Sequence, residues 1–281
     1  MSMPDLQERP TISLSSPPVR IGCVSFLNAR PLVDGLETST ARASFQVPSR
    51  LLDGLVEQRV DIALLPVIDY FRSPVPLCVV PAGGISCDGP TLTVRLFSRV
   101  SPHRIRSILV DRDSHTSVVL VQILLAERYG VRPRVVDFDP PTGGTWDVID
   151  ADAVMLIGDK VVTAPPAPHA VRHELDLGQV WNEMTGLPFV FAVWMCRQGA
   201  DLGETPKALT RLREANTSRI DELVRTHAVP RGWPPDLAHR YLTQFLEYEI
   251  GPRHLAAIER FASMAEKWGL IPGSDTLRVR K

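Results

Sequence analysis

Some polar side chains in this chain stand directly after apolar segments that read as strands, where they could do chemistry. Asn28 follows the apolar segment 19–26, and its amide could donate to a carboxylate or hydroxyl and accept from a hydroxyl. Ser86 lies in the turn-rich run 82–90, whose glycines would let backbone N–H groups approach a ligand closely. Ordinary alternatives stay open for both: Asn28 can cap a helix or occupy a turn, and the run around Ser86 can be a plain turn.

A second polar cluster opens a predicted amphipathic helix and consists of Ser114, His115, Thr116 and Ser117. Free backbone N–H groups and the helix dipole favour an anion at such an N-terminus, and the three hydroxyls could add donors. Capping of the helix by one hydroxyl is the ordinary alternative. His115 could act as a general base near neutral pH, or it could be an exposed residue at a helix start.

Other familiar catalytic patterns are missing from the sequence. It contains no Ser/His/Asp triad pattern, no Walker loop and no Rossmann fingerprint. The four cysteines form no CxxC pair, and no His/Cys cluster has the spacing of a zinc site. The sequence therefore implies neither a metal nor a cofactor.

Charge and hydropathy limit the kinds of partner. A net charge of −1 and a pI of about 6.7 argue against a nucleic-acid partner, which requires a basic excess. The longest apolar runs reach only about half of the ~20 residues that cross a bilayer, so we expect no membrane partner. Residues 1–18 read as a disordered leader without the apolar core of a secretory signal. We therefore expect a cytoplasmic protein; the sequence does not indicate its oligomeric state.

The hydrophobic pattern predicts two α/β lobes. A strand–helix–strand unit near the N-terminus requires parallel strands joined by a crossover helix, and a second set of alternating strands and helices begins near residue 107. Two apolar strands, 91–98 and 189–196, read as the crossings between the lobes. We predict that the first lobe comprises residues 19–92 and 194–281, with helices at about 204–228, 234–249 and 251–268, and that the second comprises residues 93–193.

Two lobes of this kind place their functional loops around one cleft. Ligands of open α/β sheets bind beyond the carboxyl ends of the strands. The loops after Phe26, Val80, Asp111 and Ile157 should therefore line a shared cleft. This expectation brings Asn28 and the Ser114 segment to the same place.

Five segments, in this order, resemble the chorismate dehydratase family of the futalosine route to menaquinone. They are SFLNARPLVDGLE, GISCDGPTLTVRLFS, SHTSVVLVQILLAERYG, ADAVMLIGDK and TGLPFVFAVW. Each motif alone is weak, but five in the same order are specific. The resemblance implies a type 2 periplasmic-binding-protein-like fold, with two α/β lobes around a central cleft. It also implies a lyase that removes water from chorismate, a small dicarboxylate, to give 3-[(1-carboxyvinyl)oxy]benzoate.

The resemblance also assigns roles to residues. It implies that Asn28 and Ser86 are catalytic and that the segment Ser114, His115, Thr116 and Ser117 contacts the substrate. Arg30 and Asp159, which also follow predicted strands, complete the predicted substrate-binding set; for Asp159 a surface or interlobe salt bridge is the favoured alternative.

The chemistry of chorismate suggests a hypothesis for the mechanism. Removing the C3 proton gives a dienolate, which donors on the ring carboxylate would stabilise. The base could be the substrate's own enolpyruvyl carboxylate, with Asn28 and Ser86 positioning it or the departing hydroxyl.

Three alternatives stay open. The sister enzyme that forms 1,4-dihydroxy-6-naphthoate shares the fold. A non-catalytic solute-binding protein or the sensing domain of a regulator would also have it, because fold does not fix function.

Overall fold

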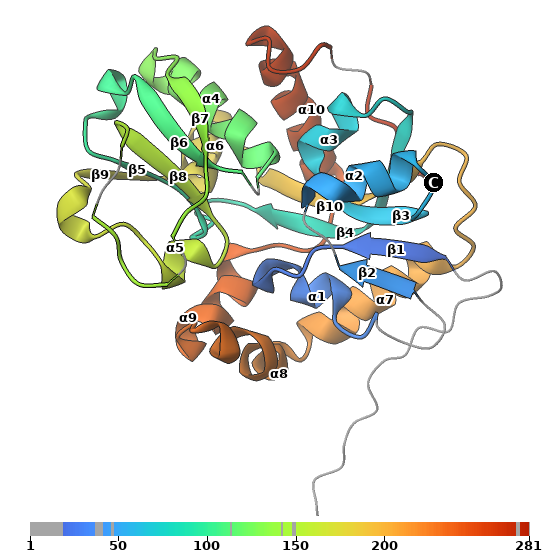
Figure 1. The fold of residues 1–281 in the computed structure, drawn as a ribbon. Helices are drawn as coiled ribbons and strands as arrows, with labels where there is room; N and C mark the ends of the chain where they lie inside the picture. The colour runs from blue at the N-terminus through green and yellow to red at the C-terminus, as the bar shows by residue number, and fades with distance from the viewer. Residues whose placement is uncertain are drawn as a thin grey trace, which may run out of the picture.

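The computed structural model describes residues 19–36, 42–45, 48–112, 114–141, 143–147, 150–273 and 276–280. The predicted leader, residues 1–18, lies outside these ranges. The described chain forms two α/β lobes, each built on a five-stranded sheet, which lie on the right and left of Figure 1. The hydrophobic pattern predicted this two-lobed arrangement.

The first sheet joins strands from distant parts of the chain. Its order is β2-β1-β3-β10-β4, with bounds Arg42–Phe45, Arg20–Cys23, Ile62–Pro66, Phe189–Arg197 and Leu77–Cys87. β1 pairs in parallel with β2 and β3, whereas β10 is antiparallel to β3 and β4. Helix α2 (Pro48–Val56) is the crossover that parallel strands require, and it buries Leu51 and Leu55.

The second sheet has the same size and a similar plan. Its order is β7-β6-β8-β5-β9, with bounds Arg134–Phe138, Ser107–Asp111, Ala153–Ile157, Val94–Ser98 and His173–Asp176. β6 is parallel to β7 and β8, and α4 (Thr116–Tyr129) connects β6 to β7. The sequence analysis did not predict β9, because this half-exposed edge strand, His-Glu-Leu-Asp, lacks an apolar pattern.

Strand β10 is part of the first sheet and bears on where the boundary between the lobes lies. Its strand partners are β3 and β4 of the first sheet, although its residues 189–193 fall in the predicted second lobe. The residue boundaries of the lobes stay a prediction.

Short helices connect these strands, and the described chain after β10 is mostly helical. The connecting helices are η1 (Leu27–Ala29), α1 (Arg30–Val33), α3 (Val67–Arg72), η2 (Pro102–Arg104), α5 (Lys160–Thr163), η3 (Pro168–Ala170) and α6 (Leu177–Thr185). The later helices are α7 (Thr205–Thr217), α8 (Ile220–Leu223), η4 (Val224–Ala228), η5 (Val229–Arg231), α9 (Pro235–Arg240), η6 (Tyr241–Phe245) and α10 (Pro252–Lys267). In the described ranges, none has both the length and the apolar character to span a bilayer.

Two predictions about local structure were wrong. Residues 82–87 of the run 82–90 are not a loop, because β4 continues to Cys87. The helix predicted at 234–249 ends at Phe245, and Glu247 forms a β-bridge with Ser86 instead. Gly84 in β4 lies against both the segment after η6 and strand β10. Its N–H donates to Tyr248 O at 3.0 Å, and a Cβ at this position would lie 2.6 Å from Ala192 O. The glycine makes room for the protein's own chain and not for a ligand.

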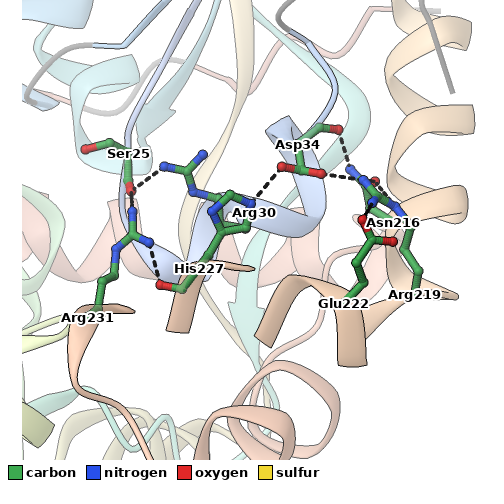
Figure 2. A network of polar contacts seen from close by, with 8 residues as sticks. All are labelled: Ser25, Arg30, Asp34, Asn216, Arg219, Glu222, His227 and Arg231. Carbon is green, nitrogen blue, oxygen red and sulfur yellow. Dashed lines mark hydrogen bonds and ion pairs between the residues drawn. The ribbon is translucent and has the colours of Figure 1, made fainter. Parts of the chain in front are cut away.

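A polar network fastens the C-terminal helices to the start of the first lobe (Figure 2). Asp34, just after α1, accepts hydrogen bonds from His227 Nε2 at 2.8 Å and from the guanidinium of Arg219. Arg231 donates to Ser25 O at 3.1 Å. The network thus holds the segment that contains Asn28 against η4 and η5.

Replacing Asp34 should weaken this network. Burial acts most strongly on the pKa of Asp34 and raises it, but hydrogen bonds from His227 and Arg219 outweigh burial, so the pKa is lowered in the folded state. The carboxylate therefore stabilises the fold fully above about pH 4, and this contribution is lost as the pH falls through the folded pKa. We expect Asp34→Asn to lower the free energy of unfolding by about 1–3 kcal/mol at pH 7, and the difference from the wild type to shrink towards pH 3.

Thermal and urea unfolding followed by circular dichroism would measure both effects. Asp53→Asn, which changes an exposed carboxylate on α2, is the matched control and should unfold like the wild type. An Asp34→Asn protein as stable as the control at pH 7 would contradict the role given to the network.

Candidate functional site

A cavity of about 690 Å3, counting space open to solvent, lies between the two lobes. It is bounded by the ends of β1, β3 and β8, by parts of β4, β5 and β10, by the start of α4 and by η6. Its apolar lining is Val24, Phe26, Leu64, Pro66, Ile85, Val94, Ile157, Phe191, Ala192 and Leu246. Its polar side chains are Asn28, Thr91, Thr93, Ser114, His115, Thr116, Ser117 and Tyr241. The strand ends of two lobes therefore meet at one cleft, as the sequence predicted.

Most of the predicted site residues line this cavity. Asn28 reaches it from η1 in the first lobe, and the segment Ser114 to Ser117 reaches it from the start of α4 in the second. The structure thus brings both predicted clusters together. Their roles in binding and catalysis stay predictions.

The hydroxyls at the start of α4 already have partners within the protein. Ser114 Oγ accepts a hydrogen bond from Ser117 N at 3.2 Å, which is ordinary capping of the helix. Thr116 Oγ1 donates to Phe191 O at 3.1 Å and accepts from Ile68 N at 3.4 Å. Thr116 therefore joins α4 to the first lobe while it lines the cavity.

Asn28 contacts a buried tyrosine. Tyr241, at the start of η6, is 1% exposed, and its hydroxyl lies 2.6 Å from Thr93 Oγ1. Burial raises the pKa of Tyr241, although hydrogen bonds with Thr93 and Asn28 oppose this effect, so the phenol is neutral near pH 7. Asn28 Oδ1 is left buried and has no partner among the described residues.

Ser86 and Arg30 do not line the cavity. Ser86 is fully buried in β4, and its hydroxyl donates to Glu247 O at 3.0 Å. Arg30 donates to Ser25 O at 3.2 Å (Figure 2). Its guanidinium carbon lies 5.6 Å from the centre of the Phe45 ring. In this structure both side chains hold parts of the first lobe together.

Asp159 does not line the cavity either, and it bridges the lobes. Its Oδ1 accepts a hydrogen bond from Trp233 Nε1 at 3.0 Å, and its Oδ2 lies 3.7 Å from Arg231 Nε. Burial raises the pKa of Asp159, and these two partners oppose the effect. The contacts correspond to the interlobe salt bridge that was the alternative interpretation of this residue.

His115 is held by a carboxylate that the sequence analysis did not single out. Its Nδ1 lies 2.9 Å from Oδ1 of Asp69, which is 2% exposed and comes from α3 of the first lobe. Tyr241, Thr91 and Thr93 were also missed as cavity residues. Asp69 follows a predicted buried strand, a position that could have signalled it, whereas Tyr241 lies in a helical region without any motif.

The described part of the chain offers no obvious metal centre. No group of three or more His, Cys, Asp or Glu side chains in it is placed to hold an ion. The polar side chains that line the cavity carry amide, hydroxyl, phenol and imidazole groups.

Comparison with known sequences gives two matches that cover most of the chain. The model of a family described as menaquinone biosynthesis matches residues 19–267. Chorismate dehydratase from Thermus thermophilus is 30% identical over 263 residues, which cover 87% of this chain and 94% of that protein.

Comparison with solved structures confirms the predicted periplasmic-binding-protein-like fold. A protein from Archaeoglobus fulgidus has a TM-score of 0.69 at 16% identity, with 90% of this chain and 98% of that chain covered. The periplasmic aliphatic sulphonate binding protein of Escherichia coli has a TM-score of 0.60 at 13% identity, with 93% and 95% covered. At these identities the likeness shows the fold alone.

The bond between Tyr241 and Thr93 should contribute to stability. We expect Tyr241→Phe to lower the free energy of unfolding by about 1 kcal/mol, because it removes the buried hydrogen bond with Thr93. Thermal unfolding would then begin about 2–4 °C lower. Tyr248→Phe is the matched control, because the Tyr248 hydroxyl is buried without a partner among the described residues. That variant should be as stable as the wild type or more so; equal losses in both variants would contradict this account.

Proposed function

The chain belongs to the menaquinone biosynthesis family, whose model matches residues 19–267, and we propose that it is a chorismate dehydratase. The reaction is the elimination of water from chorismate to give 3-[(1-carboxyvinyl)oxy]benzoate, which makes the protein a hydro-lyase. The family membership predicted from five short segments is thereby confirmed. The futalosine route and the cytoplasmic location predicted from the sequence are part of the proposal.

The cavity has the chemical character that this substrate needs. Chorismate has two carboxylates, one hydroxyl and a ring with an enolpyruvyl side chain. The apolar walls around Phe26, Ile85 and Phe191 suit the ring, and the start of α4 offers backbone N–H groups for a carboxylate. The polarity of this cleft therefore suits a small molecule that combines an apolar ring with anionic groups.

The unpartnered Oδ1 of Asn28 is the observation that carries the proposal within the site. A buried acceptor without a hydrogen bond costs about 1–3 kcal/mol, and a ligand O–H would remove that cost. The C4 hydroxyl is the O–H group of chorismate. Asn28 lines the cavity beside Tyr241, so its Oδ1 would hold the C4 hydroxyl in one orientation.

The elimination that fits this arrangement proceeds in two steps. The enolpyruvyl carboxylate of the substrate takes the C3 proton, and the electrons of the C–H bond move into the ring and its carboxylate. Donors at the start of α4 stabilise that dienolate. The electrons then expel the C4 oxygen, which takes the proton from the enolpyruvyl carboxyl group and leaves as water, so the ring becomes aromatic and the carboxylate is restored. Ser86 has no part in these steps in this structure, and its catalytic role stays a prediction.

Incubation of the purified protein with chorismate tests the proposal directly. We expect an aromatic product, seen as a change in ultraviolet absorbance and as a mass lower than that of chorismate by one water. Asn28→Ala should reduce kcat about 100-fold, the cost typical of losing one oriented polar group at a reacting oxygen. Asn182→Ala, a change near the surface of α6, is the control and should keep the wild-type rate.

Each variant would first be shown to unfold at the wild-type temperature. A wild-type protein that binds chorismate without converting it would contradict the proposal and favour a solute-binding function. Asn28→Ala with a near-normal rate would refute the role of the amide, and Ser86→Ala with a normal rate would refute the role predicted for that serine.

A further inference from the structure

His115 and Asp69 form a pair that joins the two lobes at the cavity. Both carboxylate oxygens of Asp69 lie close to His115 Nδ1, at 2.9 and 3.2 Å. Asp69 comes from α3 of the first lobe, and His115 directly precedes α4 of the second. Asp69 is 2% exposed and His115 is 29% exposed, so the imidazole separates a buried carboxylate from the open part of the site.

The hydrogen bond at Nδ1 determines what the other ring nitrogen can do. Because Nδ1 is engaged by Asp69, Nε2 is the atom available to a ligand, and within the described ranges it has no hydrogen-bond partner. An imidazolium donates from both nitrogens at once. His115 can therefore keep its bond to Asp69 and still donate to a second anion in the cavity.

The cavity otherwise lacks a positively charged side chain. Apart from His115, its described polar lining consists of one amide, five aliphatic hydroxyls and the phenol of Tyr241, which are all neutral near pH 7. A ligand with two carboxylates would lose the hydration of two charges on entering. The start of α4 compensates part of that loss, and a full positive charge beside it would compensate more.

Asp69 favours the charged form of His115. Its hydrogen bond is the largest influence on the histidine and raises the pKa above the ordinary value, although burial and the positive charge of Arg72 act in the opposite direction. The partial positive charge at the start of α4 also opposes an imidazolium. Of the other segments at this end of the cavity, β3 and β10 contribute Pro66, Phe191 and Ala192, which carry no charge.

We propose that His115, kept as an imidazolium by Asp69, binds one carboxylate of the substrate through its Nε2–H and makes the cavity selective for dianions. The inference rests on the proposed function for the identity of the substrate. His115 is then a binding residue and Asp69 a positioning residue that acts through it. The pair does not serve as the base, because the proton that a base would need to accept is already present.

The direction of the pH dependence separates these two roles. If the imidazolium binds a carboxylate, affinity is full below the pKa of His115 and falls as the pH rises through it. If neutral imidazole were the base, kcat/KM would rise over the same interval. The carboxylates of the ligand stay ionised throughout, because carboxylic acids have pKa values near 4.

The test measures binding of the stable product, 3-[(1-carboxyvinyl)oxy]benzoate, by calorimetry from pH 6 to 9. We expect the affinity of the wild type to fall by about 10- to 100-fold across this range, the value of one charge-assisted hydrogen bond. His115→Gln should bind that much more weakly at pH 6 and show little pH dependence. Asp69→Asn should shift the fall in affinity to lower pH. His103→Gln, at an exposed histidine outside the cavity, should behave as the wild type.

Turnover of chorismate by the same proteins completes the experiment. We expect His115→Gln to raise KM by a similar factor and to change kcat much less. Wild-type affinity that is constant or rises with pH, or His115→Gln that binds as tightly as the wild type, would overturn the inference. Product binding requires no catalysis, so the binding test can be interpreted even if the wild type shows no turnover. That result would contradict the proposed function alone.

Discussion

Polar groups buried at the ends of strands need hydrogen-bond partners, and in this protein many of those partners come from the opposite lobe. Tyr241 bonds Thr93, Thr116 bonds Phe191 O, Asp69 bonds His115 and Trp233 bonds Asp159. Each contact removes the cost of an unsatisfied group in a region that water enters poorly. The contacts surround a cavity in which Asn28 Oδ1 is left without a partner. The contacts between the lobes thus leave an unsatisfied hydrogen-bond acceptor, Asn28 Oδ1, in the cavity.

Much of this architecture could be predicted from the sequence because strong local signals agree with the fold. Apolar runs bounded by turn residues predicted β3, β6, β8 and β10, and the Ser114 segment marked the start of α4. Asn28 and the residues near His115 were found as strand-end positions. The family was found from motif order. These features depend on neighbouring residues in the chain, so the sequence displays them directly.

The parts that could not be predicted depend on contacts between distant residues. The glycines near Ser86 looked like a ligand loop, yet Gly84 lies in β4, leaves room for Ala192 O and donates its N–H to Tyr248 O. Arg30 and Asp159 follow strands as predicted, but Ser25 O, Trp233 and Arg231 satisfy them. Asp69 and Tyr241 form their hydrogen bonds with His115 and Thr93 only when the two lobes are in contact. No local sequence pattern distinguishes a polar side chain that faces the cavity from one that is already hydrogen-bonded to a distant part of the protein.

The position of β10 between β3 and β4 has a consequence for how the chain folds during synthesis. The strands of the second sheet lie between residues 94 and 176, so they can assemble as soon as that part of the chain is available. The first sheet cannot close until residues 189–197 arrive, and β4 lacks its central neighbour until then. Completion of the first sheet therefore requires a distant part of the chain, and such long-range pairing slows folding. The strand order therefore allows the second sheet to form during synthesis before the first sheet is complete.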